Sequence, residues 1–108
     1  MDFEAMLREN RPMRNRVTKK LIDLGLDYQL KGFRYMVDIL TISLCNKKYS
    51  QTFMSEVIPF IAKKEGIKEF SVQRQLRYTC TIKTNGRYIP NDIAHDVWVA
   101  IKKELGEY

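Results

Sequence analysis

The strongest constraint on the fold comes from residues 59–82, which read PFIAKKEGIKEFSVQRQLRYTCTI. Ile61 and Ala62 give a first helix an apolar patch with a small residue, where another helix can approach closely. Gly66 supplies the permissive backbone that a sharp helix stop requires, and we expect Ile67 to close the turn into the core. The segment therefore predicts two helices joined by a tight turn.

The second helical pattern of this segment has one apolar face. Phe70 opens the pattern, and Ser71 is the best N-cap candidate because its hydroxyl can accept a hydrogen bond from a first-turn N–H. At about 100° per residue, the positions that share one face are Val72, Leu76, Thr79 and Cys80. We expect this face to pack in the core.

The opposite face carries Gln73, Arg74 and Arg77. In the major groove an arginine fork reads guanine and a glutamine amide reads adenine, so these three are the predicted DNA base contacts. The predicted DNA backbone contacts are Lys63, Lys64, Lys68, Ser71 and Tyr78. Two helices with a glycine turn and a polar outer face also occur in other all-α proteins, so the pattern alone leaves DNA binding open.

The charge distribution favours a polyanionic partner. The chain of 108 residues has a formal net charge of +6 and a pI near 9.4. Residues 60–88 hold seven Lys or Arg against two Glu, whereas residues 89–108 hold four acidic residues against two Lys. We therefore expect DNA phosphates near the two-helix segment and not at the acidic C-terminal end.

The expected fold is all-α, a compact bundle of about five helices that contains a helix-turn-helix. Residues 31–44 have the strongest helical pattern, with an apolar band wide enough for a central helix. An earlier helix should end at Gly25, and its apolar positions are Val17, Leu21, Ile22 and Leu24. We expect residues 26–30 to connect these two helices.

Two further helices complete the expected bundle. One should begin at Ser50 or Gln51 and should be kinked or divided at Pro59. The last helix should be capped by Asn91 or Asp92. Its predicted inner face contains Ile93, Val97, Ala100, Ile101 and Leu105, with Trp98 beside it.

The two remaining segments are an N-terminal arm and a late turn. We expect an arm at residues 1–12, ended by Pro12, before a DNA-binding domain at residues 13–108. Residues 1–20 hold six basic against three acidic residues, and such arms often contact phosphates or the minor groove, although a solvated helix face is the alternative. Residues 84–87 predict a turn whose flanks are too short for a sheet.

The sequence carries no pattern typical of an enzyme. His95 is the single histidine and should face solvent or pack, and there is no nucleophile elbow or glycine-rich phosphate loop. Cys45 and Cys80 lie far apart and should be reduced core thiols, so we expect a cytoplasmic protein without metal or cofactor. No apolar run is long enough to span a bilayer. RNA binding ranks below DNA binding because we expect the aromatic residues to be buried.

Two segments resemble a known family. The run IAKKEG followed by FSVQRQLRY resembles the helix-turn-helix of the C-terminal effector domain of the stage-zero sporulation response regulator of endospore-forming bacteria. Upstream, LGLDYQLKGFRYMVDIL is similar to another segment of that family. The matching residues there are Gly25, Lys31, Gly32, Phe33, Tyr35, Met36 and Ile39. The resemblance covers residues 20–81.

The resemblance implies a bacterial transcription regulator that binds double-stranded DNA in a sporulation-type role. Arg74 and Arg77 match basic positions of the family's recognition helix, so the resemblance assigns them to DNA. Gln73 stands where the family has Glu, Ser71 where it has Arg and Tyr78 where it has His, so the preferred site should differ. The family has a longer insertion before its last element, and this chain departs from it there. The family's full-length members also carry a receiver domain, for which we expect no room in this chain.

These three differences keep an alternative function open. In that alternative the helix-turn-helix scaffold has lost its groove role and binds an acidic protein, as an antagonist of a sporulation-type regulator. A homodimer on DNA and a partner regulator protein both stay open as partners, and no membrane partner is expected.

Overall fold

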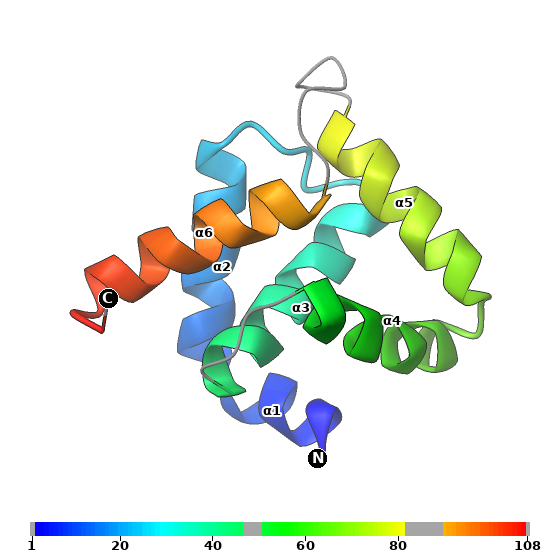
Figure 1. Cartoon of the computed structure of the whole chain (residues 1–108), viewed down its shortest axis with the longest axis horizontal. Coiled ribbons are helices and arrows are strands. Elements are labelled where there is room, and N and C mark those ends of the chain that lie inside the picture. The colour runs from blue at the N-terminus through cyan, green and yellow to red at the C-terminus, as the bar shows by residue number, and fades with distance from the viewer. Residues whose placement is uncertain (1, 47–50, 82–89, 108) are drawn as a thin grey trace.

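The computed structural model describes residues 2–46, 51–81 and 90–107, and this part of the chain is entirely helical (Figure 1). The helices described are α1 (Phe3–Glu9), α2 (Arg11–Asp23), α3 (Lys31–Asn46), α4 (Gln51–Glu65), α5 (Glu69–Thr81) and α6 (Pro90–Glu104). The all-α prediction is therefore confirmed. The helix count is one higher than expected because residues 3–9 form a helix of their own.

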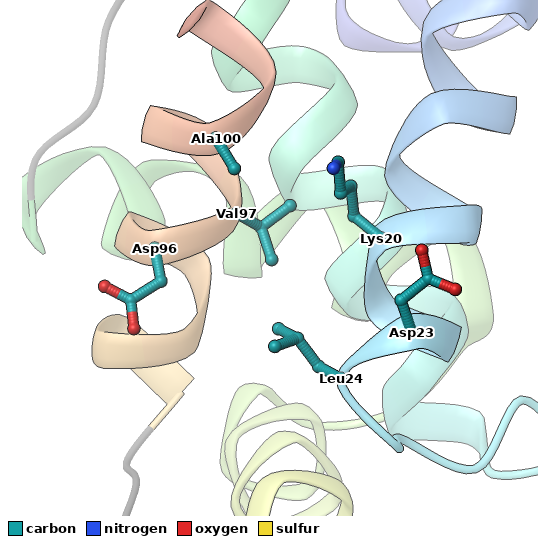
Figure 2. A pocket seen from close by; sticks show the side chains of 6 residues that line it. All are labelled: Lys20, Asp23, Leu24, Asp96, Val97 and Ala100. Carbon is teal, nitrogen blue, oxygen red and sulfur yellow. The ribbon is translucent and has the colours of Figure 1, made fainter. Parts of the chain in front are cut away.

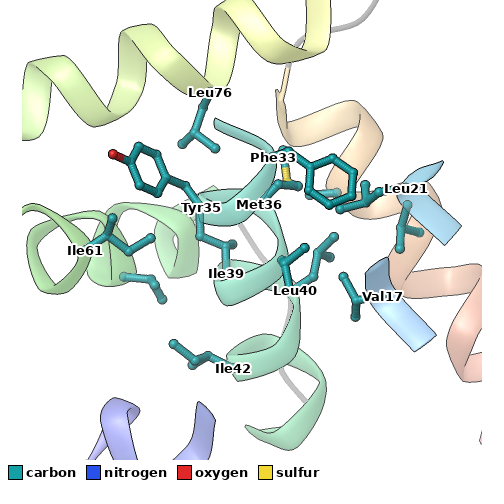
Figure 3. Packing of buried hydrophobic residues seen from close by; sticks show 14 of the residues in the cluster. Val17, Leu21, Phe33, Tyr35, Met36, Ile39, Leu40, Ile42, Ile61 and Leu76 are labelled. Atoms are coloured by element: carbon teal, nitrogen blue, oxygen red, sulfur yellow. The ribbon is translucent and has the colours of Figure 1, made fainter. Parts of the chain in front are cut away.

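Helix α3 is the centre of the fold, as its sequence pattern predicts. Each of the other five described helices contacts it, with α2 and α6 on one side and α4 and α5 on the other in Figure 1. Its residues 35–44 are all buried, which is the behaviour expected of a helix that is covered on every side. Figure 3 shows Val17 and Leu21 of α2, Ile61 of α4 and Leu76 of α5 converging on it.

Gly32 allows α5 to lie directly against the first turn of α3. A methyl group at this position would overlap the Thr79 hydroxyl and the backbone carbonyl of Gln75, both on α5. That hydroxyl donates a hydrogen bond of 2.8 Å to the same carbonyl oxygen, so the contact surface is well defined. The close approach fixes where α5 stands relative to the core.

Helices α1 and α2 meet at Asn10. Helix α1 ends at Glu9, and Pro12 lies in the first turn of α2, so the helical pattern is interrupted at Asn10, two residues before the predicted Pro12. The ring of Phe3 contacts that of Phe60 on α4 edge-on, with 5.5 Å between ring centroids. Leu7 is buried in the core, so α1 packs on the rest of the fold.

The helix starts differ from the predicted caps. Helix α5 begins at Glu69, so Ser71 lies inside its first turn and is not the N-cap. Helix α6 begins at Pro90, so neither Asn91 nor Asp92 precedes it as a cap. Proline is favoured at the first helical position because its φ is already helical and its missing N–H has no intrahelical role there.

Helix α4 is continuous. It begins at Gln51, as predicted, and runs to Glu65 without division at Pro59, which is exposed. Its residues Val57, Ile58, Ile61 and Ala62 are buried, so the apolar patch predicted at Ile61 and Ala62 faces the core.

Four apolar residues that were predicted to face the core are exposed instead: Ile22, Leu24, Ile67 and Leu105. Leu24 lies beyond α2, which ends at Asp23 before Gly25 adopts a φ of 93°. Leu105 likewise lies beyond the end of α6. Apolar periodicity that continues past a helix end no longer points to the core. The turn predicted at residues 84–87 lies outside the described residues.

Candidate nucleic-acid interface

The segment that joins α4 to α5 is a tight glycine turn, as predicted. Gly66 has a φ of 68°, a left-handed conformation that glycine adopts without strain. The N–H of Ile67 donates to the carbonyl oxygen of Ala62 at 3.0 Å, and the N–H of Gly66 donates to that of Lys63 at 3.3 Å. These bonds satisfy the last carbonyls of α4. It is thus the backbone of Ile67, and not its side chain, that closes the turn.

The inner face of α5 is the predicted one. The buried residues of this helix are Val72, Leu76, Thr79 and Cys80. They pack α5 against α3 and α4. Burial raises the pKa of the Cys80 thiol to about 12, so Cys80 is an unreactive core thiol at neutral pH.

The predicted base-contacting residues all lie on the exposed side of α5. Arg74 and Arg77 are exposed and stand opposite the buried face, one turn apart. Gln73 is also exposed, but at about 100° per residue it lies at the border between the outer and inner faces. The arginines are therefore better directed at a partner that approaches α5 from outside than the glutamine is.

Two aromatic side chains extend this surface: Tyr78, a predicted DNA backbone contact, and Phe70, which was not among the predicted site residues. Phe70 is 68% exposed and Tyr78 is 54% exposed, so the expectation of buried aromatic residues is wrong at both positions. The Arg74 guanidinium lies 6.0 Å from the centroid of the Phe70 ring, within reach of a cation–π interaction. Phe70, Arg74 and Tyr78 occur at intervals of four residues, a spacing that places them along one stripe.

The outer face of α5 consists of Phe70, Gln73, Arg74, Arg77 and Tyr78. The signal that could have found its aromatic members is this four-residue spacing, which excludes Phe70 and Tyr78 from the face of Val72 and Leu76. The general expectation that aromatic residues are buried rests on hydrophobic character alone and overlooks this spacing.

The predicted lysine contacts to phosphate differ in whether they form an ion pair within the protein. Lys63 and Lys68 are exposed, and neither forms an ion pair with another described residue. The ammonium of Lys64, in contrast, lies 3.2 Å from Asp38 Oδ2, and its side chain is 43% exposed. Lys64 is therefore partly committed to an ion pair inside the molecule.

Asp38 is a buried carboxylate in the middle of α3, with only 4% of its side chain exposed. Burial raises its pKa, and the nearby cations Lys64, Arg14 and Arg34 oppose that shift. Arg14 lies 3.8 Å from Asp38 Oδ1, an oxygen that accepts no hydrogen bond from the described residues. Asp38 thus ties α2 and the end of α4 to the central helix.

A basic pocket lies beside the outer face of α5, between this helix and the start of α3. Its volume is about 270 Å³, and it is lined by Lys31, Arg34, Tyr35, Glu65, Ile67, Ser71, Arg74 and Gln75. The one carboxylate in that lining, Glu65, accepts a hydrogen bond of 2.7 Å from Arg34. Ser71 is half-buried and belongs to this pocket, so it does not lie on the outer face itself.

A second pocket lies away from the predicted site, between α2 and α6. Figure 2 shows its lining, which is Lys20, Asp23, Leu24, Asp96, Val97 and Ala100, around a volume of about 240 Å³. His95 is exposed, as expected, and lies 4.0 Å from Asp96. Among the residues that the structure describes, no group of three or more His, Cys, Asp or Glu could hold a metal ion.

Cys45 and Cys80 are reduced thiols, as expected, with Cys80 buried and Cys45 partly buried. Where the structure describes the chain, no helix combines the length and the apolar character needed to cross a bilayer. Comparisons with protein-family models, with curated proteins and with solved structures found no match to this chain.

Proposed function

We propose that the protein binds double-stranded DNA sequence-specifically through α5 and regulates transcription. The observation that carries the proposal is the outer face of α5, which is exposed along its length while the inner face is fully buried. A helix held in this way fits a major groove about 12 Å wide. The last turn of α4 carries the exposed Lys63 and the connection to α5 carries the exposed Lys68, and both charges suit flanking phosphates.

The side chains on and beside the outer face of α5 make different kinds of contact with DNA in this proposal. Arg74 and Arg77 read guanine, and Gln73 reads adenine from the border of the face. Phe70 and Tyr78 offer apolar contact to thymine methyl groups. Ser71 and Tyr78 contact the DNA backbone together with Lys63 and Lys68. Lys64 contributes less to phosphate binding than these two lysines, because its ammonium is paired with Asp38.

The biological setting of the proposal follows the resemblance of residues 20–81 to the sporulation effector domain. On that resemblance the protein is a sporulation-type regulator of the bacterial cytoplasm, bound to DNA as a homodimer or together with a partner regulator. The outer face of α5 would act as the recognition helix of a helix-turn-helix formed by α4 and α5.

The test is duplex binding measured by fluorescence anisotropy over a series of salt concentrations. We expect log K to fall linearly with log salt, by about 0.9 units for each phosphate contacted. Arg74→Ala or Arg77→Ala should each cost ~1–3 kcal/mol on a preferred duplex, whereas Lys63→Ala should weaken all duplexes alike and reduce the salt slope by about one unit. The matched control is Lys19→Ala, an exposed lysine on α2. Binding of the arginine variants equal to that of wild type would contradict the groove assignment.

A second candidate function is recognition of an acidic protein through the same face. The observation that favours it is the exposure of Phe70 and Tyr78 beside two arginines, because aromatic residues and arginine dominate protein–protein hot spots. In that case the double variant Phe70→Ala, Tyr78→Ala should abolish partner binding, and no DNA sequence should be preferred.

A further inference from the structure

Three arginines surround a pocket at the corner where α1 meets α2. Arg8, Arg11 and Arg14 line it together with Leu7, Asn15 and Thr18, around a volume of about 430 Å³. Figure 1 shows α1 and the first turns of α2 at the opposite end of the molecule from α5. This arginine pocket is therefore separate from the outer face of α5.

The positive charge of the arginine pocket is only partly balanced from within the described residues. No carboxylate belongs to the pocket lining. Within the described part of the chain, neither Arg8 nor Arg11 forms an ion pair. Arg14 has only a 3.8 Å contact with Asp38, which Lys64 approaches more closely at 3.2 Å. Guanidinium groups gathered without a counterion repel one another, and an anion between them would relieve that repulsion.

The local structure holds the three arginines together. Arg11, Arg14, Asn15 and Thr18 recur at the spacing of one face of α2. Arg8 comes from the last turn of α1, which is anchored by the buried Leu7. The side-chain amide of Asn10 donates to the carbonyl oxygen of Met6 at 2.7 Å and makes no side-chain cap for α2, so it stabilises the bend between the helices. The pocket is thus formed before any ligand arrives.

We propose that the arginine pocket binds a phosphate group. The forked donors of Arg8 and Arg11 suit bidentate contact with phosphate oxygens, and Arg14 adds charge behind them. The amide of Asn15 lines the same pocket and can donate a further hydrogen bond. The phosphate belongs either to a small phosphorylated molecule or to a nucleic-acid backbone. The proposal holds whether or not α5 reads DNA.

Calorimetric titration of the whole chain with inorganic pyrophosphate, at constant ionic strength, tests the first source. The variant is Arg8→Gln, Arg11→Gln, and the control is Arg16→Gln, Lys19→Gln, which removes the same charge from exposed positions of α2 outside the pocket. We expect the pocket variant to weaken pyrophosphate binding at least tenfold and the control to leave it within about twofold.

Duplex DNA tests the second source with the same variants. If wild type does not bind pyrophosphate, the pocket variant should reduce the DNA salt slope by about two units more than the control does. Protection of Arg8 and Arg11 from phenylglyoxal by either ligand, mapped by mass spectrometry on wild type, would support the site without any variant. The proposal is overturned if the pocket variant and the control behave alike toward both ligands and neither ligand protects the two arginines.

Discussion

At the scale of single residues, Asp38 is the most unusual group in the described chain. It is a carboxylate buried in the central helix, and its ion pairs with Lys64 and Arg14 only partly offset the cost of removing its charge from water. Glu104 also pairs with a lysine and an arginine, but it is at the surface and its pKa is lowered, chiefly by a hydrogen bond from Lys20. The two carboxylates should therefore affect stability in opposite directions as pH changes.

The first prediction concerns this pH dependence. Because the folded-state pKa of Asp38 lies above its ordinary value of 3.8, the folded state binds the proton more tightly, and the Asp38 contribution to stability is lost as pH rises through the folded pKa. Asp38→Asn should remove that loss. The pKa of Glu104 lies below its ordinary value of 4.5, so its contribution is lost as pH falls, and Glu104→Gln should remove that acid-side loss instead.

Urea unfolding at a series of pH values from about 3 to 7 measures both effects, since the slope of unfolding free energy against pH reports the difference in bound protons. If both variants changed this slope in the same direction, the opposite pKa shifts assigned to Asp38 and Glu104 would be contradicted.

The second prediction separates two adjacent lysines of α4. Lys64→Ala leaves the buried Asp38 with only its distant contact to Arg14, and we expect a loss of ~1–3 kcal/mol in the free energy of unfolding. Solvent screening of the half-exposed Lys64 side chain should keep the loss toward the lower end of that range. Lys63→Ala is the matched control, because Lys63 has no such pair among the described residues, and should change stability by no more than about 0.5 kcal/mol. Equal stabilities in chemical denaturation would show that the ion pair contributes nothing.

At the scale of helices, the contact of α3 with α5 decides how the proposed DNA-binding helix is presented. Gly32 is buried beneath Gln75 and Thr79, so the distance between these helices depends on the absence of a side chain there. Glycine inside a helix ordinarily lowers stability by about 0.5–1 kcal/mol relative to alanine. Here the close packing that it permits outweighs that loss.

The third prediction follows from this contact. Gly32→Ala should destabilise the protein by ~1–3 kcal/mol, because the added methyl group meets backbone atoms of α5 that cannot move alone. Displacement of α5 should also weaken DNA binding. Lys31→Ala, at the exposed neighbouring position, should leave the midpoint of thermal unfolding nearly unchanged. If Gly32→Ala were instead more stable than wild type, the higher helix propensity of alanine would outweigh the clash of its methyl group with α5.

The buried face of a helix could be predicted from the sequence where its residues recur at helical spacing. The inner face of α5 was predicted residue by residue, because Val72, Leu76, Thr79 and Cys80 share one side at helical spacing. The starts of α5 and α6 were not, because Ser71 lies inside the first turn of α5 and Pro90 begins α6 before the expected cap at Asn91 or Asp92.

The candidate site could be predicted only in part. Exposure of Arg74 and Arg77 followed from periodicity, whereas exposure of Phe70 was not predicted because the aromatic residues were generally expected to be buried. The commitment of Lys64 to Asp38 depends on two residues 26 positions apart, and no local pattern reports such a pair.

At the scale of the whole molecule, positive charge is gathered in two separate places around one core. The outer face of α5 and its turn lie at one end, and the arginine pocket lies at the other, within extents of 33 × 31 × 24 Å. Charge alone attracts DNA to either place, but sequence can be read only where side chains enter a groove.

The fourth prediction tests this division of roles. Arg8→Gln, Arg11→Gln should leave the order of preference among duplex sequences unchanged, because only contacts to phosphate are affected. Competition binding against a small set of duplexes provides the comparison. A changed order of preference would mean that the arginine pocket takes part in reading bases.

The most direct test of DNA reading by α5 is selection of bound sequences from a random duplex pool. It is carried out with wild type, with Arg74→Ala, Arg77→Ala, and with the charge-matched control Arg16→Ala, Lys19→Ala. We predict that wild type and the control enrich one shared motif that contains guanine, and that the α5 variant enriches none. Sequence reading by α5 would be contradicted if wild type enriched no motif, or if the α5 variant enriched the same motif as wild type.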